Sequence, residues 1–187
     1  MLANALSASI VGVDGVPVRV EVDVSFGLPG LTIVGLAGSA VLEARERVRA
    51  ALRNSGFEVP ARRITVNLAP ADLPKEGTGH DLAMAAAILV ASGQLEADLG
   101  RVALIGELAL DGSLRPIPGA MALVAAARGA GIVEAIVPIE NGPESGAVGG
   151  VAVLPAACFS QVVRHLAGLA PLDRLERVAT SPGSPAR

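Results

Sequence analysis

The residues that could do chemistry in this sequence of 187 residues are few, and the most unusual of them is the single lysine, Lys75. A lysine amine can act as a base or nucleophile when its pKa is lowered, and as a cation it can bind an anion. Any reaction that needs a lysine must therefore use Lys75. The sequence also has one cysteine, Cys158, and two histidines, His80 and His165, that lie far apart. This spacing does not predict a zinc site.

Lys75 lies in the most unusual segment, a loop of charged residues, glycine and proline before the most apolar predicted helix. Amides at the start of that helix could hold an anion, and Lys75 could add positive charge. By residue type alone, solvated loop charges are the more frequent arrangement for Lys75 and Glu76. Asp81 is expected to cap the helix. The candidate contact residues of this loop are Pro74, Lys75, Glu76, Gly77, Thr78 and Asp81, and Arg115 near a second hairpin is a further candidate.

Other catalytic and phosphate-binding motifs are partial or missing. The segment 35–38 reads Gly-Leu-Ala-Gly between a predicted strand and a predicted helix, which suggests phosphate binding, but the full G-x-G-x-x-G is absent. A tight turn explains these glycines equally simply. The printed sequence contains no G-x-x-x-x-G-K-[ST] phosphate loop and no G-x-S-x-G nucleophile elbow.

Composition argues against several classes of function. The formal net charge is −3 and the only aromatic residues are three phenylalanines. These values disfavour a broad basic patch for phosphates and a stacking surface for bases. A single cysteine permits no internal disulfide. The longest apolar run, Leu82–Ala91, is shorter than the roughly 20 residues that cross a bilayer. We therefore expect a cytoplasmic protein with no signal peptide and no membrane partner.

The elements that must position these residues alternate between strands and helices. Alternating apolar residues predict strands at 18–24 and 63–68, and the first pairs with 6–13 through a turn at Asp14-Gly15. Further strands are predicted at 31–34, 102–110, 113–116, 135–138 and 151–154, and helices at 39–55, with Ser39 as cap, 81–92, 120–130 and 159–166. This order predicts an α+β (α/β layered) fold with a mixed sheet packed with helices. A domain is expected over 1–169 and a flexible tail over 170–187.

Several motifs in a fixed order resemble a known family. The segment 66–77, Val-Asn-Leu-Ala-Pro-Ala-Asp-Leu-Pro-Lys-Glu-Gly, resembles the hallmark of the N-terminal domain of the magnesium-chelatase-like AAA+ ATPases of the ComM/YifB type. Further matching segments are 27–30, 33–36, 43–49, 106–112 and 114–119. The resemblance runs from about Ala5 to about Leu169.

This resemblance implies the fold of the Lon proteolytic domain and of the second domain of ribosomal protein S5. Lon uses a Ser-Lys dyad, and the matching positions here are Gly79 and Met121. Neither side chain can replace its counterpart, so the resemblance implies a domain without catalytic residues. A rearranged pair of Thr78 and Lys75 is the enzymatic alternative, and weak DNA contact through the arginine-bearing helix is another.

The resemblance also implies a role beside a motor. We expect a non-catalytic assembly or interaction domain, not an enzyme on its own, with no metal and no cofactor in this chain. ATP and magnesium are expected only for the AAA+ module, which is the expected partner in cis or in trans. In the full-length family a homohexamer is expected, and DNA is a further possible partner through branch migration during transformation.

Overall fold

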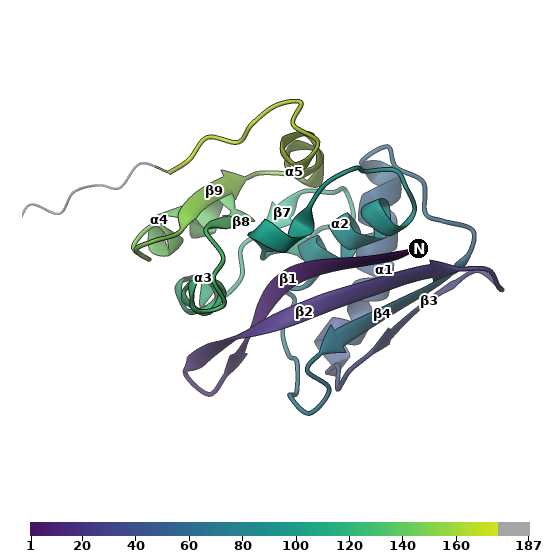
Figure 1. Cartoon of the computed structure of the whole chain (residues 1–187), viewed down its shortest axis with the longest axis horizontal. Coiled ribbons are helices and arrows are strands. Elements are labelled where there is room, and N and C mark those ends of the chain that lie inside the picture. The colour runs from purple at the N-terminus through teal and green to yellow at the C-terminus, as the bar shows by residue number, and fades with distance from the viewer. Residues whose placement is uncertain (176–187) are drawn as a thin grey trace, which may run out of the picture.

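Seven strands form one mixed sheet in the computed structural model, which describes residues 1–175. Figure 1 shows the arrangement of the elements. The strand order is β3-β4-β2-β1-β5-β8-β9. β2 runs antiparallel to both of its neighbours, whereas the other neighbouring pairs are parallel. The strands are β1 (Leu2–Val11), β2 (Asp14–Ser25), β3 (Gly30–Val34), β4 (Arg63–Ala69), β5 (Val102–Leu104), β8 (Glu134–Pro138) and β9 (Ala152–Ala156).

Helices cover both faces of this sheet. Neighbouring residues of β5, β8 and β9 enter different hydrophobic clusters, because successive side chains of a strand point to opposite faces. One cluster packs the sheet against α1 (Ser39–Asn54), α2 (Asp81–Ala91) and α5 (Phe159–Leu166), and the other against α3 (Ala120–Gly129). The remaining elements are η1 (Leu99–Arg101), η2 (Ile139–Asn141), α4 (Gly142–Ser145) and the small hairpin β6 (Glu107–Leu108) with β7 (Leu114–Arg115). The predicted layered α+β fold with a mixed sheet is confirmed.

The most apolar helix, α2, lies at the centre of the domain. Every residue from Asp81 to Leu89 is buried, and α2 contacts α1, β1 and β2. The side chains at 83, 85, 86 and 87 are all alanine. These short side chains allow neighbouring elements to pack closely against several sides of the helix. The apolar sequence of this helix therefore corresponds to burial on nearly every side, and its N-terminus carries the residues of the candidate site.

Two local predictions at the ends of elements are wrong. The first hairpin turns at Gly12 and Val13, and Asp14 already begins β2. Gly12 supplies the positive φ of 65°, whereas Gly15 is needed because a Cβ there would collide with the backbone oxygen of Ala122 in α3. Ser39 does not cap α1, because Gly38 holds the N-cap position and no side chain caps that end.

The strand expected over 102–110 is also divided. β5 belongs to the main sheet and β6 to the small hairpin. After α5 the chain runs back along β9, where the Leu175 N–H donates to the Val153 carbonyl at 2.9 Å. Of the tail predicted over 170–187, residues 176–187 lie outside the described residues. Among the helices of residues 1–175, none combines the length and the apolar character needed to cross a membrane.

Candidate functional site

The buried Lys75 holds the loop before α2 against the turn between β3 and α1. Its backbone N–H donates to the Leu36 carbonyl at 3.0 Å, and its own carbonyl accepts from the Gly38 N–H at 2.9 Å. Its ammonium donates to the Gly35 carbonyl at 2.8 Å and to the Pro70 carbonyl. The expectation of a solvated Lys75 is wrong, because these carbonyl oxygens replace water around the charge. Burial lowers the pKa of Lys75.

The Gly-Leu-Ala-Gly segment, residues 35–38, forms the turn that Lys75 contacts. Gly35 has φ 101° and Leu36 has φ 52°, so the chain passes through the left-handed region twice. A Cβ on Gly35 would collide with the Leu68 carbonyl oxygen. The Gly38 N–H, which a phosphate would need, already donates to Lys75. The segment is therefore a tight strand-to-helix turn.

Asp81 forms a buried ion pair with Arg47 of α1. The Arg47 Nε lies 2.7 Å from Asp81 Oδ2 and its Nη2 lies 3.0 Å from Oδ1. Asp81 Oδ2 also accepts from the Leu108 N–H at 3.2 Å. The hydrogen bond to Asp81 raises the pKa of Arg47. The prediction of Asp81 as a helix cap is wrong, because the cap position is His80 and the carboxylate instead joins α1, α2 and β6.

His80 is a second buried polar residue at this end of α2. Its Nδ1 lies 3.0 Å from the Ser7 hydroxyl of β1, which also donates to the Gly79 carbonyl at 3.3 Å. Desolvation, aided by the positive charge of Lys75, lowers the pKa of His80 to about 4. The imidazole is therefore neutral at pH 7. Its Nε2 has no hydrogen-bond partner among residues 1–175.

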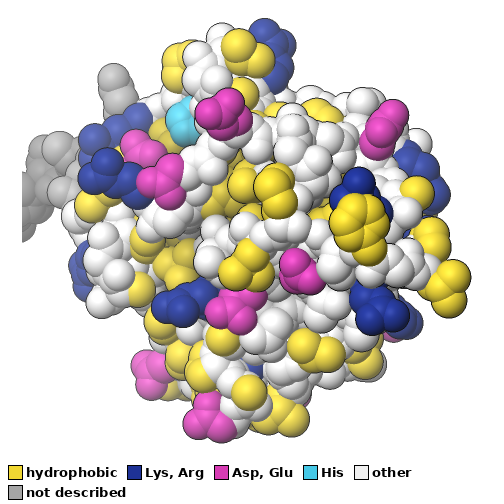
Figure 2. Space-filling view, turned by 45° about the vertical axis from the view of Figure 1, so that its right-hand side comes forward, with side chains coloured by type: hydrophobic (Ala, Val, Ile, Leu, Met, Phe, Trp, Pro, Cys, Tyr) yellow, Lys and Arg dark blue, Asp and Glu magenta, His cyan; other side chains and the backbone are white. Residues whose placement is uncertain are grey.

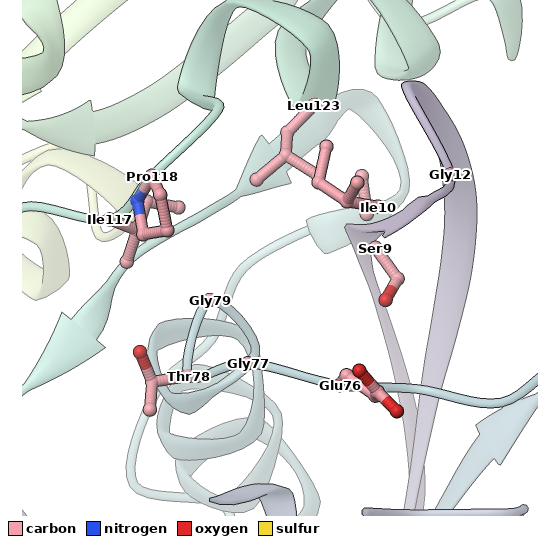
Figure 3. A pocket seen from close by; sticks show the side chains of 11 residues that line it. Ser9, Ile10, Gly12, Glu76, Gly77, Thr78, Gly79, Ile117, Pro118 and Leu123 are labelled. Atoms are coloured by element: carbon pink, nitrogen blue, oxygen red, sulfur yellow. The ribbon is translucent and has the colours of Figure 1, made fainter.

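A pocket of about 280 Å³ lies on the other side of the loop (Figure 3). Its walls are the end of β1 with the turn beyond it, the loop 76–79, and the segment 117–123, with Ile117, Pro118 and Leu123. Three of the predicted contact residues line it, Glu76, Gly77 and Thr78, together with Gly79. A Cβ on Gly79 would lie 3.3 Å from Ile117 Cδ1. Gly79, the position at which the resemblance to Lon leads us to expect the lost serine, therefore faces this pocket.

The other predicted site residues lie away from the pocket wall. Lys75 and Asp81 are buried behind the loop, and Pro74 is exposed. Met121 is half exposed in the first turn of α3. Arg115 is largely exposed, with its Nη1 3.9 Å from a Glu107 carboxylate oxygen. Within residues 1–175, no three His, Cys, Asp or Glu side chains gather in a way that could hold a metal ion.

Sequence reasoning missed three residues of this region: Ser7, Ser9 and Arg47. Ser7 and Ser9 are buried on β1, and their spacing of two is compatible with one strand face. Two serines amid apolar residues were the available signal. Arg47 lies four residues after Glu43 on α1, and its Nη1 is 3.9 Å from a Glu43 carboxylate oxygen. Its stronger partner, Asp81, is 34 residues away, which no local pattern reveals.

Comparison with known proteins identifies relatives over most of this chain. A family model described as subunit ChlI of Mg-chelatase matches residues 20–141. The protein YifB of Escherichia coli (strain K12) is 49% identical over 164 residues, which cover 87% of this chain and 32% of YifB. The competence protein ComM of Haemophilus influenzae is 50% identical over 128 residues, which cover 68% of this chain and 25% of ComM.

A more distant likeness joins the chain to Lon. The Lon protease of Salinispora arenicola is 29% identical over 149 residues, which cover 75% of this chain and 19% of that protease. The chain thus belongs to the magnesium-chelatase-like AAA+ ATPase family. Within that family it is the N-terminal, Lon-like domain of the ComM/YifB type. It spans about a third of the length of YifB.

Proposed function

We propose that this domain is a non-catalytic assembly or interaction domain of a magnesium-chelatase-like AAA+ ATPase. The observation that carries the proposal is the structural role of the Lys75 side chain. Its ammonium is buried and donates to the carbonyls of Gly35 and Pro70, so it lacks a free lone pair and access to a substrate. Gly79, which faces the pocket, offers no nucleophile.

The proposed partner of the domain is the AAA+ module, in cis or in trans, which would bind ATP and magnesium. The full-length protein would assemble as a homohexamer and act on DNA in branch migration during transformation, in keeping with the name of its relative, the competence protein ComM. This domain itself would contribute little to DNA binding. On the face in Figure 2, Lys and Arg side chains are interspersed with Asp, Glu and hydrophobic side chains, a distribution unlike the basic stripe of a DNA-binding surface.

Two assays on the purified chain test the non-catalytic part of this proposal. We expect no hydrolysis of ATP and no cleavage of casein above a blank. Casein cleavage that Thr78→Ala abolishes would establish the rearranged peptidase instead. ATP turnover that Lys75→Ala abolishes in a variant that remains folded would also contradict the proposal.

The assembly part is tested on a full-length relative such as YifB. Sedimentation with ATP and magnesium should show a hexamer for the intact protein and a smaller species when the region matching this chain is deleted. Addition of this chain in trans should restore the larger species. Hexamers of unchanged stability without the domain would exclude an assembly role.

A further inference from the structure

We propose that the pocket between the end of β1 and the loop 76–79 binds an extended peptide segment with small apolar side chains, which adds to β1 as a strand. This site goes beyond the assembly role, since it requires neither the AAA+ module nor ATP. Three features of the pocket support it: an open strand edge, unused loop amides, and the character of its lining (Figure 3).

The first feature is the free edge of β1. β1 pairs with β2 over its whole length, from Leu2 to Val11. On its other side it is paired with β5 at Leu6 alone, opposite Ala103. From Ala8 onward, this second edge has no strand partner in the described part of the chain, and it is there that Ala8, Ser9, Ile10 and Gly12 line the pocket. An open edge of this kind is a template for an added strand.

Beyond the single pairing with β5, the loop 76–79 lies beside this edge of β1. The Gly79 carbonyl accepts hydrogen bonds from the Gly106 N–H, just beyond β5, at 3.0 Å and from the Ser7 hydroxyl of β1 at 3.3 Å. These contacts fix the loop beside the open edge of β1. The space between the two is the pocket, so a chain lying in it would run next to β1.

The second feature is a run of unused amides in the loop. None of the backbone N–H groups from Glu76 to Gly79 donates to a protein acceptor within residues 1–175. Gly77 has φ 81°, a left-handed conformation that suits glycine. The residues that carry these amides line the pocket on the side opposite β1. A peptide has a carbonyl acceptor and, except at proline, an N–H donor at each residue, so an extended chain in the pocket could bond to both walls.

The third feature is the lining. Ala8, Ile10, Ile117, Pro118 and Leu123 supply apolar surface. Within residues 1–175 the Ser9 hydroxyl is buried without a hydrogen-bond partner, and Figure 3 shows it directed toward the loop. A peptide amide or carbonyl would satisfy this group.

Size and charge narrow the choice of ligand. Among the described residues that line the pocket, Glu76 alone has a charged side chain, and its carboxylate disfavours an acidic peptide. A volume of about 280 Å³ is at the lower limit for ligand pockets. It suits a few residues with small side chains better than a nucleotide or other large cofactor.

Titration of the labelled chain with acetyl-Val-Ala-Val-Ala-amide, followed through the backbone amide NMR signals, tests the proposal. We expect saturable shifts at Ala8–Gly12 and at Glu76–Gly79 below about 5 mM, the scale of weak binding. The same peptide with alternate amides N-methylated should bind at least tenfold more weakly, because it has lost its strand donors. A variant with aspartate for both valines should also bind more weakly.

Two variants locate the site. Gly79→Leu places a side chain against Ile117 and Leu123 at a position of ordinary φ and should weaken binding at least tenfold. Gly129→Leu at the far end of α3, where an added Cβ meets nothing within 4 Å, is the matched control and should bind normally. If Gly79→Leu does not fold, Ser9→Ala should still weaken binding several-fold, as expected for one lost hydrogen bond.

The proposal is overturned if the peptide causes no saturable shift, or if the shifts lie outside the pocket. Equal binding of the N-methylated peptide would also overturn it, since strand addition depends on those amides. Failure of these tests would leave the assembly proposal standing, because sedimentation of the full-length relative does not use this pocket.

Discussion

The two sides of the loop before α2 differ in how they use their polar groups. On the inner side, Lys75 and Asp81 are buried and each forms at least two hydrogen bonds. On the outer side, the amides of 76–79 and the Ser9 hydroxyl have no acceptor or partner in residues 1–175. Buried polar groups are normally paired. Among the described residues, His80 Nε2 is the exception on the inner side, and on the outer side the buried unpaired group is the Ser9 hydroxyl, since Glu76 and Gly77 are exposed. The difference supports an inner side that maintains the fold and an outer side that our proposal assigns to a ligand.

The largest effect on the inner side is expected from Asp81→Ala. The change leaves the Arg47 guanidinium, whose side chain is 17% exposed, without its buried partner. The free energy of unfolding should fall by about 3–5 kcal/mol, as in other broken buried pairs. Urea unfolding measures this loss. Glu43→Ala is the control, because its carboxylate is 75% exposed and 3.9 Å from Arg47, and it should leave stability nearly unchanged. Equal losses for both variants would contradict the assigned role of Asp81.

Lys75→Met should have the next largest effect. It removes the donor to the Gly35 carbonyl, in the turn between β3 and α1, and to the Pro70 carbonyl, just after β4. The unpaired buried carbonyls should lower the free energy of unfolding by about 3 kcal/mol. Glu76→Gln, at the adjacent exposed position, should change stability little. Unfolding curves of the two variants that coincide would show that Lys75 does not hold the turn.

A smaller, pH-dependent effect is expected from His80. Its pKa of about 4 in the folded chain lies below the ordinary value near 6.5, so the unfolded chain binds the proton more tightly. Stability should therefore fall as the pH is lowered through 6.5 toward 4, by about 2 kcal/mol between pH 7.5 and pH 5. His80→Gln should flatten this dependence, which urea unfolding at a series of pH values measures. A slope unaffected by His80→Gln would contradict a buried neutral imidazole.

The smallest effect is expected on the outer side. Thr78 lines the pocket and is only partly buried, so Thr78→Ala should leave the melting temperature within about 2 °C of the parent chain, as for most changes outside the core. A loss as large as that from Lys75→Met would mean that both sides of the loop maintain the fold, and the contrast would fail.

Sequence patterns predicted most elements of the fold but few contacts of the site. Periodicity predicted the ends of α1 and α2 to within about one residue. The apolar pattern along a helix reflects which of its faces are buried, and this pattern can be read from the local sequence. The contacts of Lys75 and Asp81 involve residues up to 40 positions away, and residue type alone favoured solvent for Lys75. The motif match identified the loop as important. Which of its side chains turn inward depends on packing against α1 and β6, which local sequence does not encode.

The single lysine allows a direct test of the central claim that Lys75 is a structural residue of the core. Reductive methylation with labelled formaldehyde can modify only the Lys75 amine and the N-terminal amine, whose nitrogen lies 2.5 Å from the Val24 carbonyl oxygen in a partly buried contact. In the native protein we predict rapid labelling of the N-terminus and almost none of Lys75, with both amines labelled in denaturant. Rapid labelling of Lys75 in the native protein would contradict the account.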